Sequence, residues 1–139
     1  MSKQIRAILV ILQGINETLN LCICRSKIPQ VINPIKINRK SFQHSEKIVI
    51  LIHGYAGNRD GPPNNSIRPA LLKYKNVNVI SVDYAPLVKY PCYFEAVQNV
   101  RLVANCLSQM INVLVGKNIV KNANLHVIGF GLGAQVAAP

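Results

Sequence analysis

Three apolar runs of strand length, each followed by a loop and then a helical segment, constrain the fold of this chain most strongly. They are residues 47–53 (KIVILIH), 77–84 (VNVISVDY) and 125–129 (LHVIG), and valine and isoleucine dominate all three. Runs of this kind are typical of strands that are buried on both faces, as in a parallel sheet. The alternation of strands and helices predicts an α/β fold with a mainly parallel sheet and right-handed crossovers.

The helices are expected between and after these runs. Residues 66–74 predict a short helix with Ser66 as its N-cap. Apolar residues recur at helical spacing over 93–115, and Gly116 is well placed to end that helix. Three parallel strands are fewer than a sheet usually has, so the predicted fold is the incomplete, N-terminal part of a larger domain.

Residues 1–46 are interpreted as a separate N-terminal segment, polar and irregular apart from an apolar start. Lys3 and Arg6 precede a mostly apolar run, so residues 1–24 partly resemble a secretory signal peptide. The run is short, however, and no small-residue cleavage site follows it. It is also too short for a transmembrane span, which needs roughly 20 apolar residues.

The chain is strongly basic, with 16 Lys and Arg against 5 Asp and Glu and a formal net charge of +11. Such a balance suits nucleic acid, anionic lipid or heparin-like partners. The cations are spread singly along the chain, however, without an aromatic-interleaved basic stripe or a zinc-finger spacing. We therefore interpret them as surface charge and expect no nucleic-acid partner.

Four cysteines, Cys22, Cys24, Cys92 and Cys106, form an even number that is compatible with disulfides. On one unbroken helix Cys92 and Cys106 would lie about 21 Å apart, whereas a disulfide needs Cα atoms within about 7 Å. Either Cys92 precedes the helix, or its partner lies elsewhere, for example in the 22/24 pair. Four small buried thiols are the alternative.

Two loops follow the carboxyl ends of predicted strands, where α/β sheets place their sites. The first is His53-Gly54-Tyr55, and the second is the turn GFGLG at residues 129–133, which opens a helix. A strand, a glycine-rich turn and a helix in this order form a nucleophile elbow, G-x-S-x-G, but Gly131 stands where the serine would be. A dinucleotide fingerprint is disfavoured, because it follows the first strand and needs an acidic residue about 20 positions later.

Taken together, the segments ILIHGYAG, VNVISVDY, YFEAVQNVRLVANCLSQMI and LHVIGFGLGAQVA resemble the secreted neutral lipases, the family of pancreatic lipases and phospholipases A1, especially its insect members. The resemblance covers roughly residues 47–138. It implies an α/β-hydrolase fold, with residues 47–139 as a partial domain that stops after the elbow. It further implies secretion, a lipid or lipid–water interface as the partner, and no cofactor.

The resemblance also assigns the site residues. The family's nucleophile corresponds to Gly131, and the two amides of the oxyanion hole correspond to Tyr55 and Leu132. Gly54, Gly129 and Gly133 would be the loop and elbow glycines. By the same comparison Asp83 is not the acid of the catalytic triad, and we interpret it as structural.

Two departures from the family pattern predict that the chain as given is inactive. Gly131 has no hydroxyl, and residues 132–139 contain neither the acid nor the histidine that follow the elbow in the family. The alternatives are a non-catalytic lipid-binding or yolk-type homologue, or a fragment without function. The three histidines all precede the elbow, and no carboxylates cluster near them, so no metal site is expected; they are His44, His53 and His126.

Overall fold

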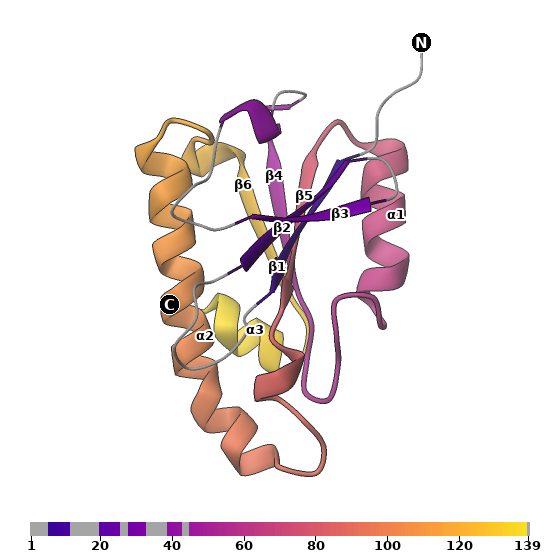
Figure 1. The fold of residues 1–139 in the computed structure, drawn as a ribbon, viewed down its shortest axis with the longest axis vertical. Coiled ribbons are helices and arrows are strands. Elements are labelled where there is room, and N and C mark those ends of the chain that lie inside the picture. The colour runs from indigo at the N-terminus through magenta and orange to yellow at the C-terminus, as the bar shows by residue number, and fades with distance from the viewer. Residues whose placement is uncertain (1–5, 12–19, 26–27, 33–38, 43–44, 139) are drawn as a thin grey trace.

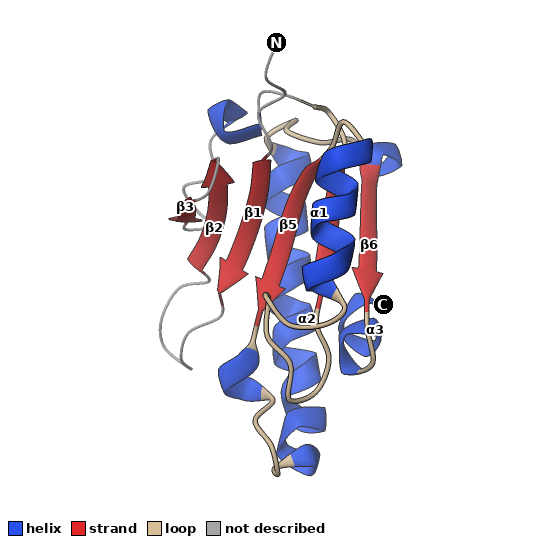
Figure 2. Ribbon diagram, turned by 90° about the vertical axis from the view of Figure 1, so that its right-hand side faces the viewer, coloured by secondary structure: helices blue, strands red, loops and turns tan. Residues whose placement is uncertain are grey.

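The structure is a computed structural model that describes residues 6–11, 20–25, 28–32, 39–42 and 45–138. One sheet lies between two layers of helices (Figures 1 and 2). Helix α1 (Asn64–Tyr74) covers one face, and helices α2 (Tyr93–Gly116) and α3 (Leu132–Ala137) pack on the other.

Six strands form the sheet, in the order β3-β2-β1-β5-β4-β6. Strands β1, β5, β4 and β6 are parallel, whereas β2 and β3 are antiparallel to their neighbours. In Figure 2 the arrowheads of β1, β5 and β6 accordingly point to the same end of the molecule, and that of β2 to the other. The strands are β1 (Arg6–Ile11), β2 (Asn20–Arg25), β3 (Ile28–Ile32), β4 (Ile48–Ile52), β5 (Asn78–Asp83) and β6 (Leu125–Gly129).

The prediction of a mainly parallel α/β sheet is confirmed, and the three predicted strands appear as β4, β5 and β6. The long helix is confirmed as α2, which ends at Gly116. The predicted N-cap of α1 is wrong. That helix begins at Asn64, and Pro63 precedes it at φ −87° without a side-chain cap. Proline already holds φ near the helical value, so the helix can start two residues before Ser66.

The expectation that residues 1–46 are irregular apart from their apolar start is also wrong, because β2 and β3 lie in the part expected to be irregular. The apolar run that resembles a leader supplies β1, whose residues 7–11 pair in parallel with residues 79–83 of β5. Pro29 belongs to β3, an edge strand, where a missing backbone N–H costs no ladder hydrogen bond toward solvent. His44 lies outside the described residues.

The core has two parts, one on each face of the sheet. Ile50 and Ile52 of β4 pack with the buried face of α2, including Val103 and Met110. The other face of β4 contributes Leu51, which packs with α1. All five residues of β4 are buried, as a central parallel strand requires. This packing fixes the carboxyl end of β4, where the first candidate loop begins.

The cysteines that the structure describes are not joined. Cys92 is exposed at the N-cap of α2, so it does precede the helix, and Cys106 is partly buried within it. Both are free thiols. Cys22 and Cys24 belong to β2, whose side chains lie outside the described part of the chain. No helix among the described residues is long and apolar enough to cross a membrane.

Candidate functional site

The two predicted loops meet at the carboxyl edge of the sheet, the lower end of the molecule in Figure 1. Strands β4 and β6 are parallel neighbours, with Ile52 beside Gly129 at their last paired position. The Phe130 N–H donates to the Ile52 carbonyl at 3.0 Å, so the pairing continues into the second loop. The loop after β4 and the turn after β6 are therefore held side by side.

The turn after β6 has the backbone of a nucleophile elbow. Gly131 has φ 56° and ψ −122°, and it is the glycine at positive φ among the described residues. The Gly133 N–H donates to the Phe130 carbonyl at 2.8 Å, and the Ala134 N–H donates to the Gly131 carbonyl at 3.0 Å. These bonds close a sharp strand-to-helix turn of the kind that strains a non-glycine residue.

Two glycines of this turn are required by space. A Cβ atom on Gly129 would lie 2.3 Å from the Gly133 carbonyl oxygen, and one on Gly133 would lie 2.4 Å from the Ile52 carbonyl oxygen. Both distances are far inside van der Waals contact with backbone. Strand β6, helix α3 and strand β4 can approach this closely only without side chains at these positions.

The middle position of the elbow differs from its flanking glycines. A Cβ atom on Gly131 would meet only the Gly54 Cα, at 3.9 Å, which is an ordinary contact. A Cβ atom on Gly54, by contrast, would lie 2.9 Å from the Phe130 carbonyl oxygen. The structure therefore has room for a side chain at 131, and backbone strain is the cost of placing one there.

The amides of Tyr55 and Leu132 remain the predicted oxyanion donors. The amides that follow these two residues are already hydrogen-bonded. Ala56 N–H donates to the Val88 carbonyl, and Gly133 N–H donates to the Phe130 carbonyl. We find no acceptor for the Tyr55 and Leu132 amides among the described residues. Leu132 is the first residue of α3, where backbone N–H groups have no partner within the helix.

Hydrogen bonds of the His53 ring hold the first loop in place. Its fully buried ring donates from Nδ1 to the Gly54 carbonyl at 2.9 Å and accepts the Tyr84 N–H at Nε2 at 3.1 Å. The ring stacks on that of Tyr84, with 4.3 Å between centroids, and the Tyr84 hydroxyl donates to the His53 carbonyl. Burial raises the pKa of Tyr84, so this hydroxyl stays a donor. The loop after β4 is thus tied to the residue that follows β5.

Asp83 lies beside this histidine at the end of β5. Its Oδ1 is 3.3 Å from His53 Nε2 and accepts the Ala85 N–H at 3.1 Å. Burial raises the pKa of Asp83, but the contacts with His53 and the Ala85 amide and the charge of Arg59 outweigh it, so this pKa is lowered. These contacts join Asp83 to the end of β4 and to the turn after β5.

His53 Nε2 lies near both a hydrogen-bond donor, the Tyr84 N–H, and an acceptor, Asp83 Oδ1. As a lone pair, Nε2 accepts the Tyr84 N–H, whereas a proton on Nε2 would be donated to Asp83. Both partners lie within hydrogen-bonding reach of this nitrogen, 3.1 Å for Tyr84 N and 3.3 Å for Asp83 Oδ1.

Two arginines that the sequence analysis did not single out fasten the loop further. Arg68 of α1 donates to Asp60 Oδ1 at 2.8 Å and reaches the Arg59 carbonyl and Ser81 Oγ at 3.3 Å. Arg59 donates to the other Asp60 oxygen at 3.1 Å. Burial raises the pKa of Asp60, but hydrogen bonds from Arg68 and Arg59 lower it below its usual value. Ion pairs between residues of a loop and a helix leave no periodic pattern, so no signal in the sequence indicates them.

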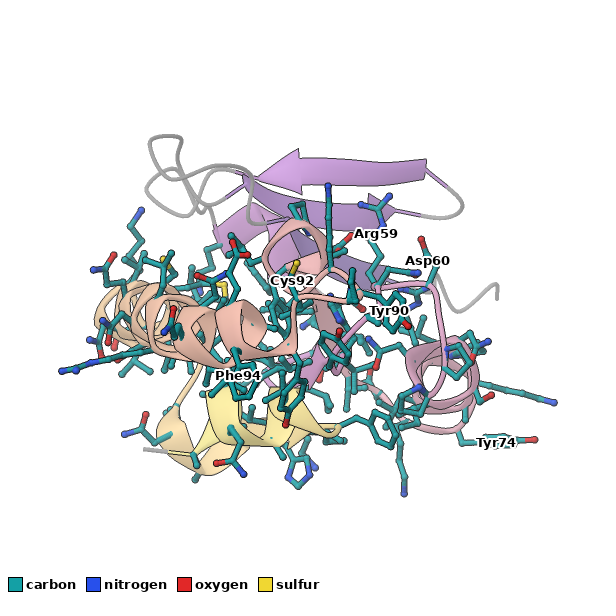
Figure 3. All side chains as sticks on the ribbon, turned by 90° about the horizontal axis from the view of Figure 1, so that it is seen from below. Arg59, Asp60, Tyr74, Tyr90, Cys92 and Phe94 are labelled. Carbon is teal, nitrogen blue, oxygen red and sulfur yellow. The ribbon has the colours of Figure 1, made fainter. Side chains whose placement is uncertain are left out.

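Aromatic side chains surround the two loops on the outside. Tyr55 packs edge-on against Tyr93, with 5.1 Å between ring centroids, and Tyr93 packs against Phe94 at 6.4 Å. Tyr90 and Phe130 are exposed beside them. We call these five residues the aromatic rim; Figure 3 shows Tyr90 and Phe94 at the end of the molecule where α2 begins. The rim was not predicted, although the letters YPCYF in the sequence carried the signal.

No metal site is found among the described residues, which hold no group of three or more His, Cys, Asp or Glu side chains. His53 is enclosed by backbone and Tyr84, and His126 is an exposed residue of β6.

Comparison with known proteins explains this arrangement. The family model described as "Lipase" matches residues 10–139. The chain belongs to the lipase family. The match includes β2 and β3, so most of the segment 1–46 lies within the matched region.

Individual lipase relatives are similar at about the same level. The chain is 32% identical to a phospholipase A1 of Vespa velutina over 109 residues, which are 73% of this chain and 36% of the relative. It is 30% identical to inactive pancreatic lipase-related protein 1 of Homo sapiens (76% and 22% covered) and to pancreatic triacylglycerol lipase of Sus scrofa (77% and 24%). The chain thus spans about a third or less of the length of these lipase relatives.

The elbow combines an intact turn with a glycine at its centre. The turn keeps the conformation and the flanking glycines of a nucleophile elbow, but its central residue, Gly131, has no atom that could attack a carbonyl carbon. What remains at the lipase elbow is a pair of candidate amide donors beside an aromatic rim. Amide donors of this kind can bind a polarised carbonyl group or an anion.

Proposed function

We propose that this lipase-family protein binds the acyl group of a lipid at the elbow and does not hydrolyse its ester bond. One observation carries the proposal: Gly131 occupies the nucleophile position in a turn whose conformation is otherwise intact. Gly129 and Gly133 keep the close backbone contacts of the turn, so the candidate amide donors stay beside each other. The proposed ligand is an acyl lipid because the relatives are named phospholipases and lipases.

Hydrolysis by a serine-type route needs a nucleophile within reach of the oxyanion donors. Residues 129–133 of the elbow contain no hydroxyl or thiol, and the last hydroxyl before the elbow, that of Ser108, lies in α2. Without a nucleophile, only the small rate effect of binding and of the oxyanion donors remains. One relative carries the word inactive in its name, the human pancreatic lipase-related protein 1.

The absence of hydrolysis is tested with the whole chain on 4-nitrophenyl butyrate and on phosphatidylcholine. We expect rates equal to those of a heat-denatured sample. We expect the same of Gly131→Ser, because no base of the described residues lies within 4 Å of a Cβ at this position, and a serine without a neighbouring base is a weak nucleophile. Turnover by the natural chain above the denatured sample would refute the proposal.

Binding is tested with a pyrene-labelled fatty acid below its micelle concentration, followed by fluorescence. Leu132→Pro removes the candidate amide donor, and proline is tolerated at the first position of a helix. Leu132→Ala removes the same side chain but keeps the amide, and it is the matched control. We expect saturable binding that Leu132→Pro weakens roughly tenfold and Leu132→Ala leaves within about twofold, since a hydrogen bond to a charged group contributes about 1.5–3 kcal/mol. Absence of saturable binding in a chain with a cooperative thermal melt would contradict the proposal.

We also propose that the protein is extracellular, because the chain is similar to pancreatic lipases and its first residues partly resemble a leader. Cleavage after residue 24 would remove β1 and most of β2. The intact mass of protein collected from the medium of expressing cells decides between a cleaved and an uncleaved form. Retention of the whole chain inside the cells would refute secretion.

A further inference from the structure

We propose that His53 is a pH-sensitive switch, which couples protonation of its buried ring to the position of the first loop and so to acyl binding at the elbow. This inference deepens the proposed function, and it rests on that function only for its effect on binding. The switch itself is a property of the fold and is tested without a ligand.

The His53 ring can change its charge at one nitrogen alone. Nδ1 lies 2.9 Å from the Gly54 carbonyl oxygen, which accepts hydrogen bonds and donates none. Nδ1 therefore carries a hydrogen whether the ring is neutral or charged, because the other tautomer would turn a lone pair toward this oxygen. Nε2 is the nitrogen that gains or loses the proton.

Nε2 has a different partner in each protonation state. In the neutral ring its lone pair accepts the Tyr84 N–H at 3.1 Å. In the charged ring Nε2 bears a hydrogen, which it can donate to Asp83 Oδ1 at 3.3 Å. One proton thus exchanges a backbone donor for a carboxylate acceptor, and the Tyr84 N–H loses its acceptor.

The charged groups at this ring come from the end of β5 and from the first loop. Burial raises the pKa of Asp83, but its contact with His53, a backbone amide and the charge of Arg59 lower it overall. Asp83 is therefore ionised where histidine rings ordinarily titrate, and it attracts the added proton. Arg59 lies 3.9 Å from the other Asp83 oxygen and opposes a second positive charge.

The other elements around the ring add no competing titration. The Tyr84 hydroxyl donates to the His53 carbonyl and keeps its proton, because burial raises the pKa of Tyr84. Helix α3, whose Gly133 lies against the His53 backbone, carries no titratable side chain, and neither does the 3-10 turn Ala85–Leu87. Arg68 of α1 is paired with Asp60 at 2.8 Å.

Burial gives the exchange a structural consequence. His53 and Tyr84 are both fully buried, so solvent does not reach the Tyr84 N–H when its acceptor is lost. A buried amide without a partner is unfavourable, and we expect the backbone to move until this amide finds another acceptor. His126 of β6 is exposed, so its protonation has no such consequence.

The backbone after Tyr84 connects the switch to the candidate oxyanion donor at Tyr55. Tyr84 is the N-cap of the 3-10 turn Ala85–Leu87, and Val88 follows that turn. The Val88 carbonyl accepts the N–H of Ala56, the residue after Tyr55, at 2.9 Å. A shift of the Tyr84 backbone therefore reaches the Tyr55 amide, and we expect acid to weaken acyl binding.

The switch is tested by NMR spectroscopy of the whole chain labelled with nitrogen-15. A hydrogen bond from the Tyr84 N–H to Nε2 gives a scalar coupling between the two nitrogen nuclei, and protonation of Nε2 removes it. We expect this coupling near about pH 8 and its loss toward about pH 5, with the Tyr84 amide signal shifting in the same step. Asp83→Asn should move the step to lower pH, because it removes the charge that attracts the proton.

Two glutamine variants assign the step. His53→Gln keeps an oxygen that can accept the Tyr84 N–H but does not titrate, so the step should disappear. His126→Gln is the matched control, since it removes an exposed histidine and should leave the step unchanged. If His53→Gln does not fold, the natural chain, Asp83→Asn and the control still decide.

Three results would overturn the switch. The first is a His53 ring that titrates while the Tyr84 amide signal stays in place. The second is a coupling that persists until acid unfolds the chain. The third is a step that His126→Gln abolishes.

A pyrene-labelled fatty-acid methyl ester tests the effect on the elbow, because this ligand has no titratable group. We expect the natural chain to bind it roughly three- to tenfold more weakly at about pH 5.5 than at about pH 7.5, as a displaced hydrogen-bond donor implies. A folded His53→Gln should bind it equally at both values.

The two measurements separate this inference from the proposed function. Saturable binding that is equal at both pH values, in a chain whose Tyr84 amide switches, would refute the coupling to the elbow and leave acyl binding standing. No binding at either pH value would refute the proposed function and the effect on it, whereas the NMR step would still establish the switch in the fold.

Discussion

The glycines of the elbow differ in what a methyl group would meet. At 129 and 133 the added Cβ would overlap backbone oxygen, whereas at 131 it would meet nothing closer than 3.9 Å. Gly116, at the end of α2, offers a reference, because nothing lies within 4 Å of its Cβ position and its φ is not positive. Four alanine substitutions therefore separate overlap, backbone strain and simple helix propensity.

We predict a graded series of stabilities for these alanine variants. Gly129→Ala and Gly133→Ala should each lower the free energy of unfolding most, by roughly 3 kcal/mol or more, because backbone must move. Gly131→Ala should cost about 1–3 kcal/mol from strain alone, and Gly116→Ala should raise stability by about 0.5–1 kcal/mol. Urea denaturation followed by circular dichroism measures all four, and equal costs at 129 and 131 would contradict this account.

Asp83 gives the fold a pH dependence whose sign is fixed by its environment. Its folded pKa is lowered, so its contribution is present above the unfolded value of 3.8 and is lost as the pH falls below that value. We predict that Asp83→Asn lowers stability at neutral pH and flattens the loss of stability on acidification through this range. Urea midpoints between neutral pH and about pH 3 measure the effect.

A second carboxyl provides the comparison for Asp83→Asn. Asp60 also has a lowered pKa, but its side chain is 61% exposed, so solvent screens its ion pairs. Asp60→Asn should reduce the loss of stability on acidification less than Asp83→Asn does. The reverse order would show that the pair with His53 contributes little.

The elbow could be predicted from the sequence, because the spacing of its glycines after an apolar run is a local pattern. The partners of His53 could not. Tyr84 and Asp83 lie 31 and 30 residues away, and only the pairing of β4 with β5 brings them to the same edge of the sheet. The side chains that fix the first loop thus depend on tertiary contacts that no local signal encodes.

At the scale of the elements, the sequence indicated half of the strands. β4, β5 and β6 were predicted because continuous apolar runs signal burial on both faces. β1 has a similar run, but at the start of a chain such a run also resembles a leader, and pairing with β5 about 70 residues later distinguishes the two. β3 contains Pro29, which argues against a strand unless the strand is known to lie at an edge.

Helix α1 carries a proline in its interior, Pro69, and its first turn has no side-chain cap. The proline removes a backbone donor and crowds the carbonyl four residues earlier. We predict that Pro69→Ala raises the free energy of unfolding by about 1 kcal/mol, since the gain in the helix exceeds the added freedom of the unfolded chain.

Pro86→Ala is the control for the helix substitution. Pro86 sits at the start of a short 3-10 turn, where the missing N–H would have no partner within the turn. Its replacement should leave stability unchanged or slightly lower. A similar gain at both positions would mean that the effect comes from the unfolded state alone.

At the scale of the whole molecule, the net charge of +11 opposes the compact state. We predict that salt stabilises the fold, with a higher urea midpoint at about 300 mM than at about 20 mM NaCl, because the Debye length shortens below the spacing of surface cations. A potassium glutamate series with the same ionic strengths controls for effects specific to chloride. A midpoint that falls with salt in both series would show that ion pairs such as Arg68–Asp60 outweigh the repulsion.

The room around position 131 has a consequence for how this protein can change. Because the flanking glycines and the pairing of β4 with β6 hold the turn, its shape does not depend on the residue at its centre. A glycine at this position removes the nucleophile and leaves the turn in place. A substitution at 131 costs only the local backbone strain. Position 131 can therefore exchange glycine for a small side chain while the strands, the turn and the helix around it keep their places.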